Sequence, residues 1–302
     1  SRTLSGRWWK KGSPAGNTMP TGLGLVLRLL RHTLVPPWPT GPRTPRRLGL
    51  LLLLTPPFLL LQGLHWVGFI LDDLLFRGYR KVPIVEPLFI VGLPRSGTSF
   101  LQRVIAEDSE RFTTLRLWEL ILAPSVTERK LWRGLAALDK RLGGPFGRLV
   151  GWGSRKGFRW LDVIHEVAWD DPEEDFFLLL PAFACFLLVV PFPYHDEIWK
   201  LTRFDQLPDE ERRRIMTFYR SNLQRHLYVA GAGKRLLSKN PSFTPFLRSL
   251  RETFPDGKFL CCVRDPMEVV PSQLSSIRAG ASLFGYDVAE PRIRDRFVTM
   301  LE

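Results

Sequence analysis

The chain has 302 residues, of which 45% are apolar, so it is long enough for one large domain or two small ones with a buried core. Its formal net charge of +13 is concentrated at one end, because residues 1–71 contain nine Lys and Arg residues and no Asp or Glu. The remainder holds 34 basic and 30 acidic residues. This balance argues against a nucleic-acid-binding face and favours a local pocket for an anionic ligand.

The three cysteines, Cys185, Cys261 and Cys262, form no C-x-x-C pair. Adjacent Cys261 and Cys262 would point to opposite faces of a strand. We therefore expect neither a disulfide framework nor a metal site, and the cysteines are interpreted as small buried hydrophobic residues.

The N-terminal 75 residues divide into two segments of different character. Residues 1–47 are basic and rich in Pro, Gly and Ser, which predicts a poorly ordered arm with one short amphipathic helix within 22–34. Residues 48–75 form an apolar helical segment, and its first 24 residues carry no charge. That length suffices to span a bilayer.

Two interpretations of the apolar segment remain open. Basic residues precede it and Asp72 and Asp73 follow it, as in a signal anchor with a cytoplasmic N-terminus, of the Golgi type if the protein is eukaryotic. Alternatively, Pro56 and Pro57 break it into two short apolar helices that lie on the membrane or on the domain. A bacterial protein would then be cytoplasmic or peripheral.

From about residue 80 the pattern predicts alternating strands and helices. Short apolar runs indicate strands at 85–91, 235–241 and 258–266. Helical spacing is found at 98–107, 209–231, 241–254 and 267–280. This alternation predicts an α/β fold, with a P-loop-type parallel β-sheet flanked by helices on both faces.

The first candidate site is the turn GLPRSGTS at 92–99. Gly92 and Gly97 have the spacing of a nucleotide-binding P-loop, but Thr98 stands where NTPases have lysine. A helix N-terminus has unpaired N–H groups and partial positive charge, so it can hold an anion. A 5′-phosphosulfate fits this turn better than a triphosphate; the alternative is an ordinary strand-to-helix turn.

The second candidate site is CVRDPMEVVPSQLS at 262–275, in which Arg264 ends a strand and Ser272 follows eight residues later. Together with the first turn, this motif resembles the sulfotransferases that use 3′-phosphoadenosine 5′-phosphosulfate (PAPS). The resemblance covers roughly residues 70–280 and includes Trp118-Glu119 and Lys239-Asn240-Pro241. It implies that the 3′-phosphate is bound by Arg264 and Ser272, and the phosphosulfate by Arg95, Ser96, Gly97, Thr98 and Ser99.

The resemblance implies transfer of a sulfuryl group from PAPS to a hydroxyl or amine of an acceptor, which is a glycan, a lipid or a small molecule, with no metal required. Glu119, 24 residues after Arg95, is the first candidate for the general base, and Lys239 would neutralise the bridging oxygen. Glu174 and His165 are the fallback candidates. The alternatives are a non-catalytic protein that binds PAPS or its product 3′-phosphoadenosine 5′-phosphate (PAP), and a P-loop nucleotide kinase.

We assign residues 80–302 to the sulfotransferase domain. Related folds have a further basic loop over the 3′-phosphate, whereas only 22 residues follow Gly280 and RIRDRF at 292–297 is their only basic cluster. The domain is therefore expected to be incomplete at its C-terminal end.

Overall fold

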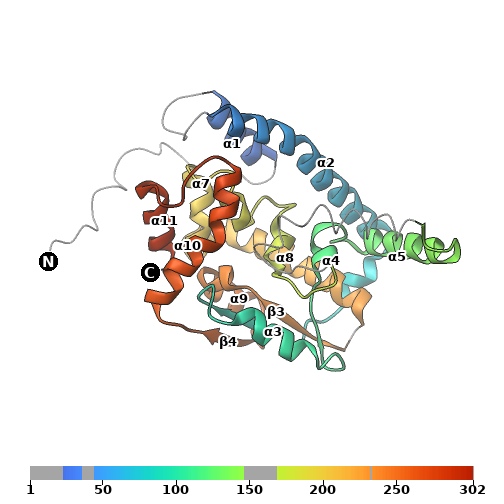
Figure 1. The fold of residues 1–302 in the computed structure, drawn as a ribbon. Coiled ribbons are helices and arrows are strands. Elements are labelled where there is room, and N and C mark those ends of the chain that lie inside the picture. Colours follow the sequence, from blue (N-terminus) through green and yellow to red (C-terminus); the bar gives the residue numbers. More distant parts are fainter. Residues whose placement is uncertain (1–22, 36–43, 146–168, 232, 302) are drawn as a thin grey trace.

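A computed structural model describes residues 23–35, 44–145, 169–231 and 233–301. Its centre is a parallel sheet of four strands in the order β2-β3-β1-β4 (Figure 1). The strands are β1 Leu88–Gly92, β2 Phe112–Thr113, β3 Arg235–Lys239 and β4 Lys258–Cys262. With helices packed around this sheet, the structure confirms the predicted α/β fold.

The two central strands, β1 and β3, overlap the apolar runs 85–91 and 235–241 that predicted strands. Phe89, Ile90 and Val91 of β1 and Leu236 and Leu237 of β3 are all buried, as expected for parallel strands covered on both faces. β4 differs, because it lies at the edge of the described sheet and most of its side chains are exposed or half-exposed. Cys261 is therefore exposed, which corrects the expectation that all three cysteines are buried.

The helices that follow the strands agree closely with the expected ranges. α3 is Thr98–Ala106, α8 is Asp209–Ala230 and α10 is Pro266–Leu283. The single helix expected at 241–254 is instead a 3₁₀ helix, η5 Pro241–Phe246, followed by α9 Leu247–Thr253. Pro245 lies inside η5, and proline cannot donate the hydrogen bond that a regular α-helix needs. The described residues after position 76 also form α4 Leu117–Ile121, α5 Val126–Arg141, α7 Asp196–Trp199, α11 Pro291–Leu301, η1 Arg77–Lys81, η2 Asp175–Leu179, η3 Phe186–Val189 and η4 Lys200–Gln206.

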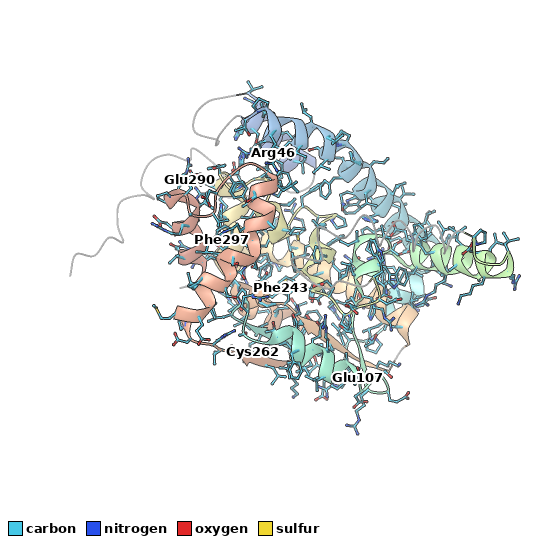
Figure 2. The ribbon with its side chains drawn as sticks, viewed as in Figure 1. Arg46, Glu107, Phe243, Cys262, Glu290 and Phe297 are labelled. Atoms are coloured by element: carbon cyan, nitrogen blue, oxygen red, sulfur yellow. The ribbon has the colours of Figure 1, made fainter. Side chains whose placement is uncertain are left out.

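The core lies between the sheet, α8 and the apolar stretch 176–194. That stretch forms η2, η3 and connecting turns, and it buries side chains such as Leu178, Cys185 and Val189. Phe243 of η5 joins the same core and lies near the middle of the molecule (Figure 2).

The N-terminal part contains two helices, α1 Leu23–Leu34 and α2 Pro45–Leu75. α1 is the predicted short helix, and its Leu25, Val26 and Leu29 belong to the core. α2 continues through Pro56 and Pro57 as one helix of 31 residues, so the expectation that this pair breaks the segment is wrong. Both prolines lie on the exposed side of the helix, where no packed neighbour opposes the local distortion that proline imposes.

Candidate active site

The two sequence motifs meet at the carboxyl ends of β1 and β4. Gly92 pairs with Cys262 in the sheet register, and its φ of +123° lies in the region that favours glycine. A Cβ atom at Gly92 would lie 2.0 Å from the carbonyl oxygen of Cys262. This close approach places the turn after β1 beside the turn after β4, and Leu93 N donates to Cys262 O at 3.1 Å.

The turn between β1 and α3 exposes donors at the start of a helix. Arg95 and Gly97 adopt positive φ values of 64° and 86°, and Gly97 is the N-cap of α3. The Ser96 hydroxyl donates to Leu93 O at 2.5 Å and so closes the turn on itself. Arg95 and Ser99 are exposed, whereas Thr98 is buried.

Arg95 connects this turn to the second motif. Its Nε donates to the Ser272 Oγ of α10 at 3.1 Å, while Arg264 Nη1 donates to the carbonyl oxygen of Arg95 at 3.0 Å. The structure thus brings the two predicted anion sites into direct contact. The backbone of Arg95 has a left-handed conformation that is unfavourable for a residue with a Cβ, and the bond from Arg264 to its carbonyl oxygen holds it.

Arg264 also forms an ion pair with a carboxylate one helical turn away. Its Nε and Nη2 lie 2.7 and 2.6 Å from Glu268 Oε2, and both side chains are about half exposed. The guanidinium of Arg264 is therefore both paired with Glu268 and accessible to solvent.

Lys239, at the end of β3, lies on the other side of the turn. Its Nζ donates to Ser99 Oγ at 3.1 Å and to Glu174 Oε1 at 2.8 Å. The Lys239 side chain is 3% exposed and that of Glu174 is 23% exposed. A cation and a carboxylate therefore sit together at the start of α3, and the carboxylate reaches solvent.

A buried network fixes the backbone next to Glu174. Asp175 accepts hydrogen bonds from Tyr219 OH at 2.6 Å and from Asn240 Nδ2 at 3.3 Å. Burial raises the pKa of Asp175 to about 6, although the bonds from Tyr219, Ser238 and Asn240 act in the opposite direction. The network ties η2 to the end of β3, which sets Glu174 opposite Lys239.

Glu119 belongs to a different cluster. Its Oε2 accepts from the Arg116 backbone N at 3.1 Å, so it caps α4. Its Oε1 lies 3.4 Å from Nη1 of Arg129, which is fully buried. Burial, and then the charge of Arg129, lower the pKa of His226 well below its ordinary value, so the 3.6 Å approach of Glu119 to His226 involves a neutral imidazole.

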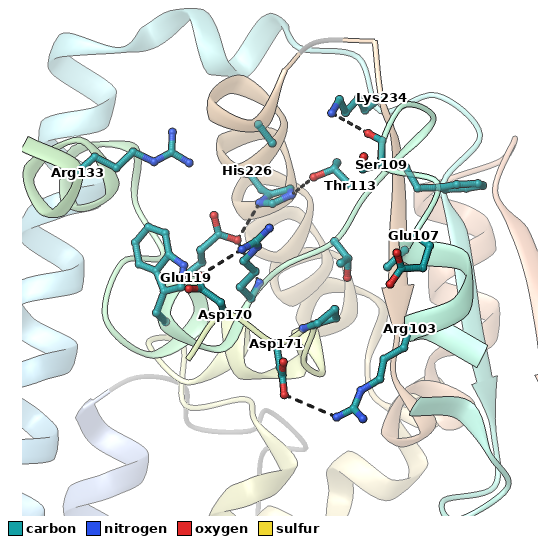
Figure 3. Close-up of a pocket in the computed structure, with 17 residues that line it drawn as sticks. Arg103, Glu107, Ser109, Thr113, Glu119, Arg133, Asp170, Asp171, His226 and Lys234 are labelled. Atoms are coloured by element: carbon teal, nitrogen blue, oxygen red, sulfur yellow. Dashed lines mark hydrogen bonds and ion pairs between the residues drawn. The ribbon is translucent and has the colours of Figure 1, made fainter. Parts of the chain in front are cut away.

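A cavity of about 630 Å³ lies beside this cluster (Figure 3). One wall comes from the later turns of α3, where Arg103 pairs with Asp171 at 3.7 Å. Ser99 and Arg103 are four residues apart on α3, hence neighbours on one helix face. The cavity therefore begins one turn along α3 from the Lys239–Ser99 contact. Its lining is strongly polar and includes Arg116, Arg133, Asp170, Lys234, Trp118, Glu119 and His226.

Sequence reasoning missed the pairing of Lys239 with Glu174, because the two residues are 65 positions apart in the chain. The acid-rich stretch before η2, DDPEED at 170–175, was the signal that could have pointed to it. His165 lies outside the described residues. Within those residues, no group of three or more His, Cys, Asp or Glu side chains is arranged to hold a metal ion.

The fold and this site define an α/β protein in which a glycine-containing turn joins the first strand of the sheet to a helix. The turn lies at the carboxyl ends of the parallel strands, which is where ligands bind in open α/β sheets. A family model described as "Sulfotransferase family" matches residues 87–301. The chain belongs to the sulfotransferase family. No curated protein sequence matches it significantly.

Two solved structures are similar in fold. Sulfotransferase STF9 from Mycobacterium avium superposes with a TM-score of 0.60 at 20% identity, over 86% of this chain and 61% of that one. Sulfotransferase STF1 from Mycobacterium tuberculosis H37Rv gives a TM-score of 0.57 at 20% identity, over 75% of this chain and 60% of that one. The chain thus spans about three fifths of the length of either protein.

Proposed function

We propose that the protein transfers a sulfuryl group from PAPS to a hydroxyl or amine of an acceptor. The observation that carries the proposal is the direct contact between the turn that holds Arg95 and the motif that holds Arg264 and Ser272. A nucleotide with phosphates at both its 3′ and 5′ positions needs two such sites side by side. The arrangement needs no metal, because cationic side chains and helix N–H groups supply the positive charge.

The residues around the turn fit such a donor. The N–H groups at the start of α3, together with Arg95 and the Ser99 hydroxyl, would hold its 5′ end, and Arg264 with Ser272 would hold its 3′-phosphate. Apart from the residues that adjoin Gly97 in the chain, no atom of the described residues lies within 4 Å of the place that a Cβ at Gly97 would occupy, so this side of the turn is open. PAPS supplies an activated sulfuryl group; the protein's part is to orient it and to neutralise charge.

We assign the general base to Glu174 rather than to Glu119. The general base and Lys239 would act on the same sulfuryl group, so the base must lie near Lys239. Glu174 meets this requirement, because it is 2.8 Å from Lys239 Nζ and partly exposed. Glu119 is instead occupied by the cap of α4 and by Arg129. Glu174 would take the proton from the acceptor, while Lys239 and Ser99 would stabilise negative charge that develops on the leaving phosphate.

The cavity along α3 is the proposed acceptor site. Cationic, anionic and hydroxyl groups line this cavity together with Trp118. Such a lining suits a polar acceptor with several hydroxyl groups, such as a glycan or a polar headgroup. An apolar lipid or small molecule fits this cavity less well, because few of the residues that line it are apolar. Association with a membrane is a further part of the proposal, supported by the length and composition of α2.

The test is transfer of radiolabel from ³⁵S-labelled PAPS to panels of glycan, lipid, phenol and peptide acceptors. Glu174→Gln is the matched control, because it keeps the size of the side chain and removes the base. The proposal expects label in at least one acceptor class with the native protein and loss of that label in the variant. Saturable binding of PAP without transfer to any class would instead support a non-catalytic nucleotide-binding protein.

A further inference from the structure

The polarity of α2 is inverted relative to that of an ordinary surface helix. Four polar or charged side chains, each at most 3% exposed, lie on the face toward the domain: Arg47, Gln62, His65 and Asp72. The outer face carries only apolar residues, namely Leu53, Pro56, Pro57, Leu60, Leu64, Val67, Ile70 and Leu74. A helix at a protein–water boundary has the opposite arrangement.

Polar contacts attach the C-terminal half of α2 to the domain. Asp72 accepts from the N–H groups of Val126 and Thr127 at 2.8 Å each and pairs with Arg225 at 3.0 Å. His65 Nδ1 lies 2.7 Å from an oxygen of Glu128. These are buried contacts, so separating the helix from the domain would leave charged groups without partners.

The N-terminal half is attached as well. The guanidinium of Arg47 lies over the ring of Tyr194, 5.2 Å from its centre, and Leu51 belongs to the hydrophobic core. Figure 1 shows α2 running along one side of the molecule between α1 and α5. The helix therefore follows the domain over its whole length of about 46 Å.

Exposed cationic residues flank the apolar outer face at both ends. Arg28, Arg31 and Arg46 precede it, and Arg77 and Lys81 follow it. Trp66, 44% exposed, lies beside the face and directs its indole N–H toward Pro181 O at 3.0 Å. Anionic lipid headgroups attract such cations, and tryptophan favours the membrane–water interface.

We propose that the outer face of α2 binds the surface of a lipid bilayer, with the helix lying parallel to the membrane plane. This inference rests on the membrane association proposed above and specifies its geometry. A helix docked on a water-exposed domain from end to end cannot also cross a hydrocarbon layer of about 30 Å. A protein partner fits less well, because protein interfaces carry about one hydrogen bond per 100–200 Å² and the outer face offers no polar side chain.

The first experiment measures co-sedimentation of the full chain with phosphatidylcholine vesicles that contain phosphatidylglycerol. In the variant L53Q/L60Q/L64Q, partition into the vesicle pellet should fall by about tenfold or more. The control V85Q/V104Q/L187Q removes three exposed apolar side chains outside α2 and should stay within about twofold of the native protein. Failure of the native chain to bind vesicles, or an equal loss in both variants, would overturn the membrane association.

The second experiment separates the parallel orientation from a spanning one. Arg28→Cys before α2 and Glu210→Cys at the start of α8 are placed singly in a C261S/C262S background, and vesicle-bound protein is treated with a membrane-impermeant maleimide. Both positions should react to completion before detergent is added, because α1 and the domain lie on one side of the bilayer. Protection of position 28 alone would overturn the parallel orientation and leave membrane association intact.

Discussion

Arg95 Nε donates a hydrogen bond to Ser272 Oγ at 3.1 Å, although 177 positions separate the two residues in the chain. The contact exists because β1 and β4 are adjacent and Gly92 lets their carboxyl ends approach closely. Two motifs that had been linked only by resemblance therefore form one continuous, cation-rich surface.

Substitutions of Arg264 and Ser272 should weaken the binding of nucleotides that carry a 3′-phosphate and leave the binding of other nucleotides unchanged. Ser272→Ala should lower the affinity for PAP about tenfold and Arg264→Ala about a hundredfold, because each would remove one of the charge-assisted bonds proposed to hold the 3′-phosphate. Isothermal titration calorimetry measures both effects. The control ligand is adenosine 5′-phosphate, which lacks the 3′-phosphate and should bind each variant as it binds the native protein. An equal loss with both ligands would contradict the assignment.

Removing the competing carboxylate should strengthen binding. Glu268 occupies the guanidinium of Arg264 in a half-exposed pair, which is worth at most about 1 kcal/mol. Glu268→Gln should therefore raise the affinity for PAP by a factor of about two to five. The gain should shrink at high salt, because screening weakens the pair in the native protein. Unchanged or weaker binding at low salt would show that Glu268 does not compete with the ligand.

The two candidate bases should respond differently to the same isosteric change. Glu174→Gln should lower turnover by about 10²- to 10⁴-fold, with PAP affinity close to native. Its cost in stability should be smaller than that of Glu119→Gln, because Glu174 reaches solvent and Lys239 keeps its bond to Ser99. Glu119→Gln should mainly destabilise the fold, by about 3 kcal/mol, because it leaves the buried Arg129 without its counter-charge. Denaturation curves and single-turnover rates of both variants check this. An inactive but fully stable Glu119→Gln protein, beside an active Glu174→Gln protein, would favour Glu119 as the base.

Asp175 should make stability depend on pH. Its folded pKa of about 6 lies above the ordinary value of 3.8, so the folded state holds the proton more tightly than the unfolded state. This stabilisation is complete below about pH 4 and is lost as the pH rises through 6; it amounts to about 3 kcal/mol. Asp175→Asn cannot lose a proton. Urea denaturation should therefore show the variant gaining stability relative to native between pH 4 and 7, whereas a constant difference would exclude this titration.

The sequence predicted those parts of the fold that depend on local patterns. The three long strands and α3, α8 and α10 each have the apolar spacing and flanking residues that specify them. β2 was not predicted, because two residues, Phe112 and Thr113, carry no detectable periodicity and are paired only through β3. The continuity of α2 depends on its position at the surface, which the sequence of Pro56-Pro57 does not reveal.

The site was predictable to the extent that its motifs are contiguous in sequence. The turn at 92–99 and the pair Arg264–Ser272 could be recognised separately. The partner of Lys239 depends instead on tertiary packing: Asp175 must be held by Tyr219 and Asn240 before Glu174 faces the end of β3. The burial of Glu119 against Arg129 also arises from the packing of α4 on α5 and α8, which no local pattern specifies.

Calorimetric titration of the protein with PAP in the presence of EDTA, compared with titration by ATP and Mg²⁺, tests whether the two adjacent anion sites hold one nucleotide. Two adjacent anion sites without a metal predict saturable, equimolar binding of PAP that EDTA does not change, and much weaker binding of ATP–Mg²⁺. Tighter binding of ATP–Mg²⁺, or no heat with PAP, would contradict the claim that Arg95, Arg264 and Ser272 together hold a doubly phosphorylated adenosine.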